Sequence, residues 1–327
     1  MRRLVIALAA LACLAAPASA LAVPFLPPHG KVFSGVTGSQ TVGGFTGQVG
    51  NRPAVVGFFT KFWGANEFIF RSAENANARL MLHISTQNGY GTPEVITPLG
   101  IAKGKGDTYL VGLNRRIAEF GQPTYIRLMA EMNQANNGYS AFDRSGRSRG
   151  ASHSAAAFKQ AWRRATLILR GGPVDQIDAK LHALHLPPVA TRAAALPAAP
   201  VAMTWVPQTR GTPDIAANMP RAYYPGDAYV DWVGTDFYSR FPNFGWLEDL
   251  YRSFPNKPFV FGEWAMWGGD DPGFVSRFFG WIASHPRVRM AVYNNQGESA
   301  GPFSLTRYPR SKAALRHALA SPRFKLR

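Results

Sequence analysis

Two glutamates each end a short apolar run, and they are the residues of this chain best placed to do chemistry. Glu131 follows the run at residues 124–130, and Glu263 follows residues 257–262. A carboxylate at the tip of a buried strand is costly unless it faces a polar pocket. Two such carboxylates, far apart in sequence, therefore predict one shared active site.

The other glutamates do not show this pattern. The chain has eight glutamates, and the remaining six lie in helix-like or loop-like stretches where a solvated carboxylate is expected: Glu67, Glu74, Glu94, Glu119, Glu248 and Glu298. Either strand-end glutamate alone is also compatible with a surface carboxylate at a strand-to-loop junction. As a pair, they indicate a glycoside hydrolase, in which two carboxyl groups flank the scissile bond.

The elements that position this pair alternate between strand and helix. Hydrophobic periodicity predicts eight strands, at 32–36, 55–60, 80–85, 125–131, 201–206, 232–238, 259–263 and 288–294. Amphipathic helices are expected between several of them, at 107–120, 154–169, 246–254, 272–284 and 312–318. The pattern predicts an α/β fold, a single-domain (β/α)8 TIM barrel, with an open doubly wound sheet as the alternative. No Gly-x-Gly-x-x-Gly follows the first strand, which disfavours a dinucleotide-binding version of that sheet.

The expected barrel covers residues 31–320 and is preceded by two short segments. Residues 1–20 have the basic start, apolar run and Ala-x-Ala end of a signal peptide, and residues 21–30 form a Pro-rich lead-in. We therefore expect a secreted protein, extracellular or periplasmic, cleaved near Ala20. A Pro/Ala-rich insertion at 172–200 is expected to cover the barrel flank between the fourth and fifth strands.

The cysteine content and the net charge indicate how the chain is anchored and which partners it could bind. Cys13 is the single cysteine and lies in the expected signal peptide; a lipid anchor there is an alternative, although the surrounding residues match a lipobox poorly. The formal net charge is +17, which favours polyanionic partners. The basic residues are dispersed without a DNA-binding signature, so anionic cell-envelope polymers, or solubility alone, are favoured over specific nucleic-acid binding. No stretch approaches the length of a transmembrane segment.

In a barrel, the C-terminal ends of the strands converge on one face, where the loops build the site. Glu131 would end the fourth strand and Glu263 the seventh, and those positions face each other. Carboxyl groups about 5 to 5.5 Å apart would give retention of configuration, and about 6.5 to 9.5 Å would give inversion. Arg127 lies four residues before Glu131, so strand alternation turns both side chains inward. There, Arg127 would keep carboxylates ionised or form a structural ion pair.

Several sequence blocks then resemble glycoside hydrolase family 26, the β-mannanase family of the retaining barrel clan. The resemblance spans about residues 30 to 310, and its motifs are specific in combination. The blocks are Arg-Leu-Met-Ala-Glu-Met-Asn at 127–133, Phe-x-x-x-Trp-Arg at 158–163, Met-Thr-Trp-Val-Pro at 203–207, Tyr-Pro-Gly-Asp-x-Tyr-Val-Asp-Trp-Val-Gly at 224–234, and Lys-Pro-x-x-x-x-Glu at 257–263.

The resemblance implies roles for individual residues. It implies that Glu131 is the general acid/base, that Glu263 is the nucleophile, and that Tyr238 holds the nucleophile by a hydrogen bond. Trp205 matches a family tryptophan, with a sugar-stacking floor or core packing as its two interpretations. Further residues fit a carbohydrate cleft equally with packing or loop roles: the aromatic residues Trp63, Trp264, Trp267 and Tyr293, and the polar residues Asn133, Asp236, Asn294 and Gln296.

The sequence also departs from the family pattern. Family members typically carry a histidine directly before the acid/base, where this chain has Ala130, and the aromatic cluster that usually follows is replaced by residues 134–139. The predicted function is a secreted retaining glycosidase on β-linked polysaccharide, with β-mannan first and other β-glycans as alternatives. A non-catalytic glycan-binding or envelope-associated protein on the same fold is the competing hypothesis. Metal-binding, serine-hydrolase and phosphate-loop motifs are absent from the sequence, so neither a metal nor a cofactor is expected.

Overall fold

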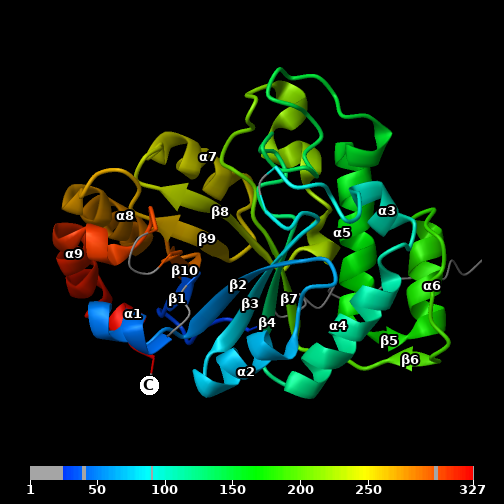
Figure 1. Ribbon diagram of the computed structural model, residues 1–327, viewed down its shortest axis with the longest axis horizontal. Helices are drawn as coiled ribbons and strands as arrows, with labels where there is room; N and C mark the ends of the chain where they lie inside the picture. Colours follow the sequence, from blue (N-terminus) through cyan, green and yellow to red (C-terminus); the bar gives the residue numbers. More distant parts are fainter. Residues whose placement is uncertain (1–24, 39–41, 90, 298–300, 327) are drawn as a thin grey trace, which may run out of the picture.

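A closed barrel of eight parallel strands forms the centre of the molecule (Figure 1). The computed structural model describes residues 25–38, 42–89, 91–297 and 301–326, so the expected signal peptide and Cys13 lie outside the described residues. The strands follow one another around the barrel in chain order, and β1 pairs with β10 to close it. None of the helices in the described ranges has the length and apolar character needed to cross a membrane.

The barrel strands agree closely with the predicted ones. They are β1 (Phe33–Thr37), β2 (Val55–Lys61), β3 (Arg79–Ser85), β4 (Thr124–Leu128), β7 (Val201–Trp205), β8 (Trp232–Tyr238), β9 (Phe259–Ala265) and β10 (Val288–Asn294). The predicted TIM-barrel fold is confirmed. The fourth strand differs, because it ends at Leu128 and leaves Glu131 beyond it.

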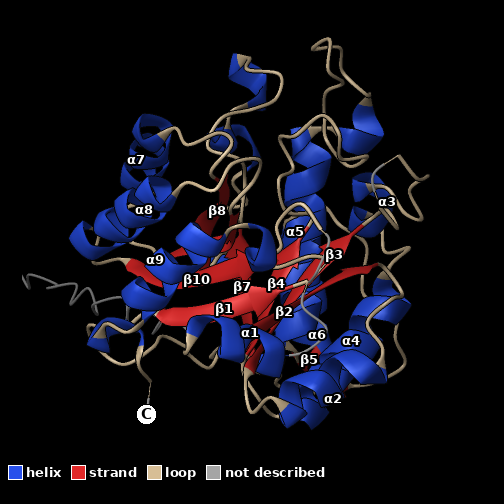
Figure 2. Ribbon diagram, turned by 60° about the vertical axis from the view of Figure 1, so that its left-hand side comes forward, coloured by secondary structure: helices blue, strands red, loops and turns tan. Residues whose placement is uncertain are grey.

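Helices surround the barrel in an outer layer (Figure 2). The expected helices are present as α4 (Asp107–Phe120), α5 (Ala155–Arg170), α7 (Phe244–Ser253), α8 (Pro272–Ser284) and α9 (Pro309–Leu319). The shorter helices are α1 (Val42–Val49), α2 (Glu67–Asn75), α3 (Pro98–Ala102) and α6 (Val174–Ala183). Between β7 and β8 the described chain makes three single 3-10 turns, at 216–218, 220–223 and 227–229, in place of an α-helix.

Strand alternation divides the apolar side chains into two cores. One set points into the barrel, where Tyr125 and Trp232 meet edge to face with ring centroids 5.6 Å apart. The other set packs between the sheet and the helices and contains most of the buried aromatic side chains. Because neighbouring residues on a strand face opposite sides, a one-residue difference decides whether a side chain reaches the barrel interior.

The segment at residues 172–200 is held against the helical layer by a buried ion pair. Arg164 on α5 bonds Asp107 on α4, with Nε 2.7 Å from Oδ1, and both side chains are almost fully buried. Arg164 also donates to the carbonyls of Pro187 and Pro188, and Asp107 accepts from the amide of Ala190. The pair therefore joins two helices to the Pro/Ala-rich segment.

Replacing Asp107 should destabilise the fold strongly. Asp107→Ala leaves the guanidinium of Arg164 buried without its carboxylate, which costs about 3 to 5 kcal/mol in the free energy of unfolding. Urea denaturation followed by circular dichroism measures this loss. Asp249→Ala, at an exposed carboxylate on α7, should change the same free energy by less than about 0.5 kcal/mol. Equal losses in the two variants would contradict the role of the buried pair.

Candidate active site

Polar side chains from five strands meet at the C-terminal end of the barrel. Register places His83 on β3 beside Arg127 on β4, and Asp236 on β8 beside Glu263 on β9. Tyr238 from β8 and Asn294 from β10 complete the group through hydrogen bonds to Glu263. The strands thus bring together residues that are more than 200 positions apart in sequence.

Arg127 is the centre of this group and is 1% exposed. Its Nη2 lies 2.6 and 2.9 Å from the two carboxylate oxygens of Asp236, and its Nη1 lies 2.9 Å from Oε1 of Glu263. Burial alone would lower the pKa of Arg127, but Asp236 and Glu263 raise it, so the guanidinium stays charged. A Cβ atom at position 262 would lie 2.8 Å from Nε of Arg127, so glycine is needed there.

Glu263 is held as an ionised carboxylate. Arg127 binds its Oε1, while its Oε2 accepts from the hydroxyl of Tyr238 at 2.5 Å and from Nδ2 of Asn294 at 2.8 Å. Burial would raise the pKa of Glu263, but the charge of Arg127 and the hydrogen bonds from Tyr238 and Arg127 lower it. Burial and Glu263 raise the pKa of Tyr238, which therefore remains a phenol that donates.

Glu131 reaches the site through a kink and not by strand alternation, which corrects the sequence-based argument. After β4 ends, Met129 and Glu131 adopt left-handed backbone conformations, with φ of 48° and 53°. Each such conformation costs a non-glycine residue about 1 to 2 kcal/mol. The amide of Glu131 is anchored to the carbonyl of Val206 at 2.7 Å, just past β7.

The loop after β4 fixes this kink from outside. The hydroxyl of Tyr139 donates to the carbonyl of Ala130 at 2.6 Å, and Nδ2 of Asn137 donates to the carbonyl of Glu131 at 3.0 Å. Arg149 donates to the carbonyls of residues 135, 137 and 138 of the same loop. These bonds offset the backbone strain and hold Glu131 in one orientation.

Glu131 differs from Glu263 in its charge state. Burial and the negative charge of Glu263 raise the pKa of Glu131 to about 7, against the lowering effects of Arg127 and a hydrogen bond from Gln208. No cation bonds the Glu131 side chain directly within the part of the chain that the structure describes. Near neutral pH the pocket therefore holds an ionised Glu263 beside a Glu131 that is about half protonated, which is the difference needed for acid and nucleophile.

His83 adds a neutral imidazole that the sequence analysis overlooked. Burial and the charge of Arg127 lower the pKa of His83 to about 3, and Nδ1 lies 3.9 Å from Oε1 of Glu263. Neither ring nitrogen has a hydrogen-bond partner among the described residues. Phe59 packs against this ring, with centroids 5.5 Å apart, and is itself 40% exposed. The pair offers an apolar face next to Glu263, with both imidazole nitrogens buried.

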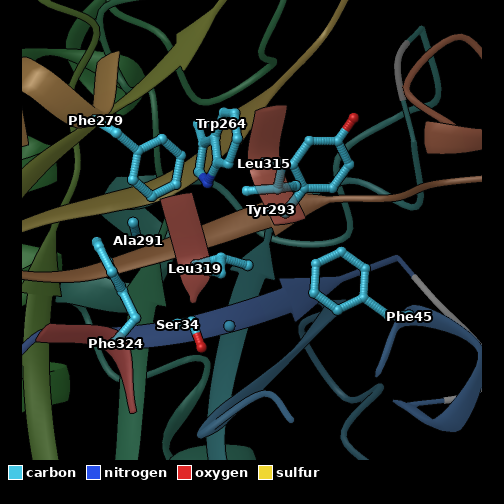
Figure 3. Close-up of a pocket in the computed structure, with 10 residues that line it drawn as sticks. Ser34, Phe45, Trp264, Phe279, Ala291, Tyr293, Leu315, Leu319 and Phe324 are labelled. Carbon is cyan, nitrogen blue, oxygen red and sulfur yellow. The ribbon is translucent and has the colours of Figure 1, made fainter. Parts of the chain in front are cut away.

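Three predicted aromatic residues lie outside this site. Trp205 is fully buried against Tyr224 and Phe254 in the outer core, so its sugar-stacking interpretation is corrected to core packing. Trp264 and Tyr293 also point away from the barrel interior; Figure 3 shows both rings among apolar side chains beneath the helices. Trp264 directly follows Glu263, and Tyr293 directly precedes Asn294. Because Glu263 and Asn294 point inward, the alternation of side chains along a strand turns both rings outward.

The other predicted residues have clear positions. Asn133 is fully buried and exchanges two hydrogen bonds with the main chain of Gln208, at 2.9 and 3.1 Å, so it braces the loop that reaches Glu131. Trp267 is partly exposed and packs edge to face against Tyr238 at 5.7 Å. Trp63 is 51% exposed and lies just past β2, against Phe62.

Sequence reasoning gave too little weight to His83, Asn294 and Phe59. His83 has the strand alternation of a residue that points inward near the end of β3, which was the available signal. Within the described ranges no three His, Cys, Asp or Glu residues form a group that would hold a metal ion. The importance of Asn294 depends on the closure of β10 against β9, which is a property of the fold.

Comparison with solved structures shows a shared fold. A family 26 β-mannanase from Bacteroides ovatus matches with a TM-score of 0.60 and 15% identity over 90% of this chain and 90% of that chain. A family 26 protein from Muricauda sp. matches with a TM-score of 0.57 and 16% identity, covering 90% and 91%. A modular endo-β-1,4-mannanase from Cellulomonas fimi matches with a TM-score of 0.55 and 16% identity, covering 91% and 72%. No protein-family model matches the sequence, and no curated protein is significantly similar to it.

Neutralising Glu263 should lower the pKa of Glu131. Glu263→Gln removes the negative charge that raises this pKa and leaves the lowering effect of Arg127 in place. A carbon-13 NMR titration of the glutamate carboxyl groups should then show Glu131 ionising below its wild-type value of about 7. Glu67→Gln, an exposed change on α2, should leave that titration unchanged. An unaltered midpoint in Glu263→Gln would show that the two carboxyl groups are not coupled.

Proposed function

We propose that the protein is a glycoside hydrolase of family 26 that cleaves β-linked polysaccharide with retention of configuration. The observation that carries this proposal is the difference in pKa between the two glutamates of the pocket. Glu131 has a pKa of about 7, and Glu263 is held ionised by Arg127. Retaining glycosidases need this combination of acid and nucleophile. The shared fold with family 26 β-mannanases supports the proposal and makes β-mannan the first choice of substrate.

In the first step, a carboxylate oxygen of Glu263 attacks the anomeric carbon while the bond to the leaving oxygen breaks. Glu131 donates its proton to that oxygen, which leaves as a sugar hydroxyl, and a glycosyl ester forms on Glu263. Arg127, Tyr238 and Asn294 hold the nucleophile in a fixed orientation, so little reorganisation is needed during the attack.

In the second step, Glu131 is ionised and takes a proton from water. The water oxygen attacks the anomeric carbon, the ester bond to Glu263 breaks, and the sugar is released with its original configuration. The charge on Glu263 reappears as Glu131 regains a proton, so the raised pKa of Glu131 is restored for the next cycle.

His83 and Phe59 are the side chains best placed to contact the sugar beside Glu263. The exposed ring of Phe59 suits the apolar face of a pyranose, and the neutral ring of His83, whose two nitrogens are buried, packs beside it. Ala130 is 1% exposed with its side chain in the inner barrel core, so it gives the sugar no polar contact. The selectivity for one sugar over another would then depend on His83 and on the loops around the pocket.

Secretion fits this proposal, because a polysaccharide too large to enter a cell must be cut outside it. The N-terminal sequence that predicts export lies outside the described residues, so N-terminal sequencing of the exported protein is the direct check. The excess of positive charge also allows contact with anionic cell-envelope polymers, which is compatible with an enzyme that works close to the cell surface.

Hydrolysis of a polysaccharide panel tests the proposed activity. The wild type should release reducing sugar from β-mannan, or from a β-glucan or β-xylan, and Glu263→Ala should lower kcat by at least about ten-thousandfold, since the covalent step is lost. Glu67→Ala, on the outer surface, should retain full activity. Binding of a polymer without any hydrolysis by the wild type would instead favour the non-catalytic glycan-binding function.

The pH profile should have its basic limb near pH 7. Glu131 must be protonated for the first step, so kcat/KM should fall as pH rises through its pKa of about 7. On the acid side, activity should persist below the ordinary glutamate pKa, because that of Glu263 is lowered. In Glu131→Gln the basic limb should disappear, and an aryl glycoside, whose leaving group needs no proton, should lose far less activity than the polymer. An unchanged basic limb in that variant would contradict the role of Glu131.

A further inference from the structure

The face opposite the active site carries a group of positive charges, which we call the basal face. In Figure 1 the long loops of the active-site end lie at the top, and the C-terminal end of the chain lies at the bottom. The basal face is formed where the barrel strands begin and where both ends of the described chain pack. Its cations are Lys31, Arg52, Arg79, Arg289, Arg323 and Lys325.

Hydrogen bonds place these cations close together. Arg289, at the start of β10, donates to the carbonyls of Pro27 and Pro28 at 2.7 and 2.8 Å. Lys31 donates to the carbonyl of Pro322 at 2.8 Å, and the amide of Val32 donates to the carbonyl of Arg323 at 2.9 Å. The lead-in before β1 and the C-terminal segment are therefore neighbours beneath the barrel.

Arg79 joins the same face from β3. Its guanidinium lies 4.4 Å from the ring centroid of Phe33, on the adjoining region of the barrel base. Arg52 donates to the carbonyl of Ala76, immediately before β3 begins. These contacts use main-chain oxygens or an aromatic ring, so they orient the side chains without neutralising them.

Among the described residues, none of the six basal cations has a carboxylate within 4 Å. The pKa of Arg289 is lowered by burial and by the positive charge of Arg323, as expected for like charges held near each other. Asp231 is the one acidic residue in the short segments that begin the barrel strands, and it is already bonded to Arg170.

The active-site end carries some of its cations in ion pairs. Arg147 bonds Asp143 and Arg210 bonds Asp214, both at 3.2 Å, whereas Arg144 bonds the side-chain oxygen of Asn136 and Arg240 lies over the ring of Trp267. The basal cations lie at the other end of the barrel from the catalytic pocket. A partner attracted by them would bind without blocking the substrate.

An apolar side chain projects from the basal face. Leu26 is 43% exposed, while its neighbours on either side are fixed: the carbonyl of Phe25 accepts from the hydroxyl of Tyr125 at 2.6 Å, and Pro27 is buried and bonded through Arg289. The backbone around Leu26 is thus anchored to the barrel, and its exposed side chain lies next to the prolines whose carbonyls Arg289 bonds. Basic side chains around an exposed leucine are typical of surfaces that enter the headgroup region of a bilayer.

We propose that the basal face binds the surface of an anionic lipid bilayer. The cations lie against the lipid headgroups, Leu26 enters the interface, and the catalytic pocket faces away from the membrane toward polymeric substrate. Charge alone would also suit a soluble acidic polysaccharide. The exposed leucine favours the bilayer, because a hydrated polysaccharide has no apolar layer to receive it.

Co-sedimentation with vesicles tests this proposal. The exported protein, cleaved near Ala20, should bind vesicles of phosphatidylcholine with 30% phosphatidylglycerol (~0.1 M salt) much more strongly than pure phosphatidylcholine vesicles, and about 0.5 M salt should release it. The variant Lys31→Glu/Arg52→Glu/Lys325→Glu should lower the partition coefficient at least about a hundredfold, since each cation contributes about fivefold. Leu26→Ser should lower it by a smaller factor.

A charge-matched control separates this face from net charge. Lys103→Glu/Lys105→Glu/Arg115→Glu makes the same change at exposed residues near α3 and α4, and should retain nearly full binding. Equal loss in both triple variants, or retained binding in the basal variant, would overturn the proposal. Binding of a soluble acidic polysaccharide without binding of anionic vesicles would also overturn it. Hydrolytic activity should be unchanged in the basal variant, so failure here is independent of the proposed enzyme function.

Discussion

The buried guanidinium of Arg127 is the interaction on which the rest of the site depends. It is almost fully enclosed, and its charge is tolerated only because Asp236 and Glu263 surround it. Those carboxylates belong to two different strands, β8 and β9. The ion pairs therefore also hold β4 in position relative to these two strands across the barrel. A glycine at position 262 gives the guanidinium room against β9. The side chain of Arg127 therefore both holds strands of the barrel together and keeps Glu263 ionised.

The guanidinium of Arg127 also creates the difference in pKa between Glu131 and Glu263. Glu263 bonds Arg127 directly and receives two further hydrogen bonds, whereas Glu131 stands beyond the end of its strand and is influenced by Arg127 only at a distance. The kink after β4 produces this asymmetry, because it moves Glu131 out of reach of the donors on the strands. Loop residues 137–149 then stabilise the kink from outside. A strained backbone segment beside a catalytic group is the usual situation in enzymes, where neighbouring contacts offset the strain.

The two ends of the barrel also differ in how their charges are held. The mouth concentrates carboxyl groups around one buried guanidinium and pairs Arg147 and Arg210 with carboxylates, while basal cations such as Lys31 and Arg289 bond main-chain oxygens and have no carboxylate within 4 Å among the described residues. Parallel strands make this separation natural, since all C-terminal ends lie on one face and all N-terminal ends on the other. A protein bound by its basal face would present its pocket to the surrounding solution in one orientation.

The sequence by itself determined the barrel, the boundaries of most strands, the pair Glu131 and Glu263, and the inward position of Arg127. These follow from apolar periodicity and polar residues at strand ends, and motif blocks that resemble a known family added Tyr238 as the hydrogen-bond donor to Glu263. Asp236, expected among the residues of a carbohydrate cleft, is instead the buried ion-pair partner of Arg127. The tertiary structure alone decided which face each aromatic ring occupies, so Trp205, Trp264 and Tyr293 proved to be packing residues of the outer core. It also decided the orientation of Glu131, the contacts of His83 and Asn294, and the grouping of the basal cations. The physical reason is that a one-residue shift in strand register reverses a side chain, and that a pKa depends on charges that only the folded chain brings together.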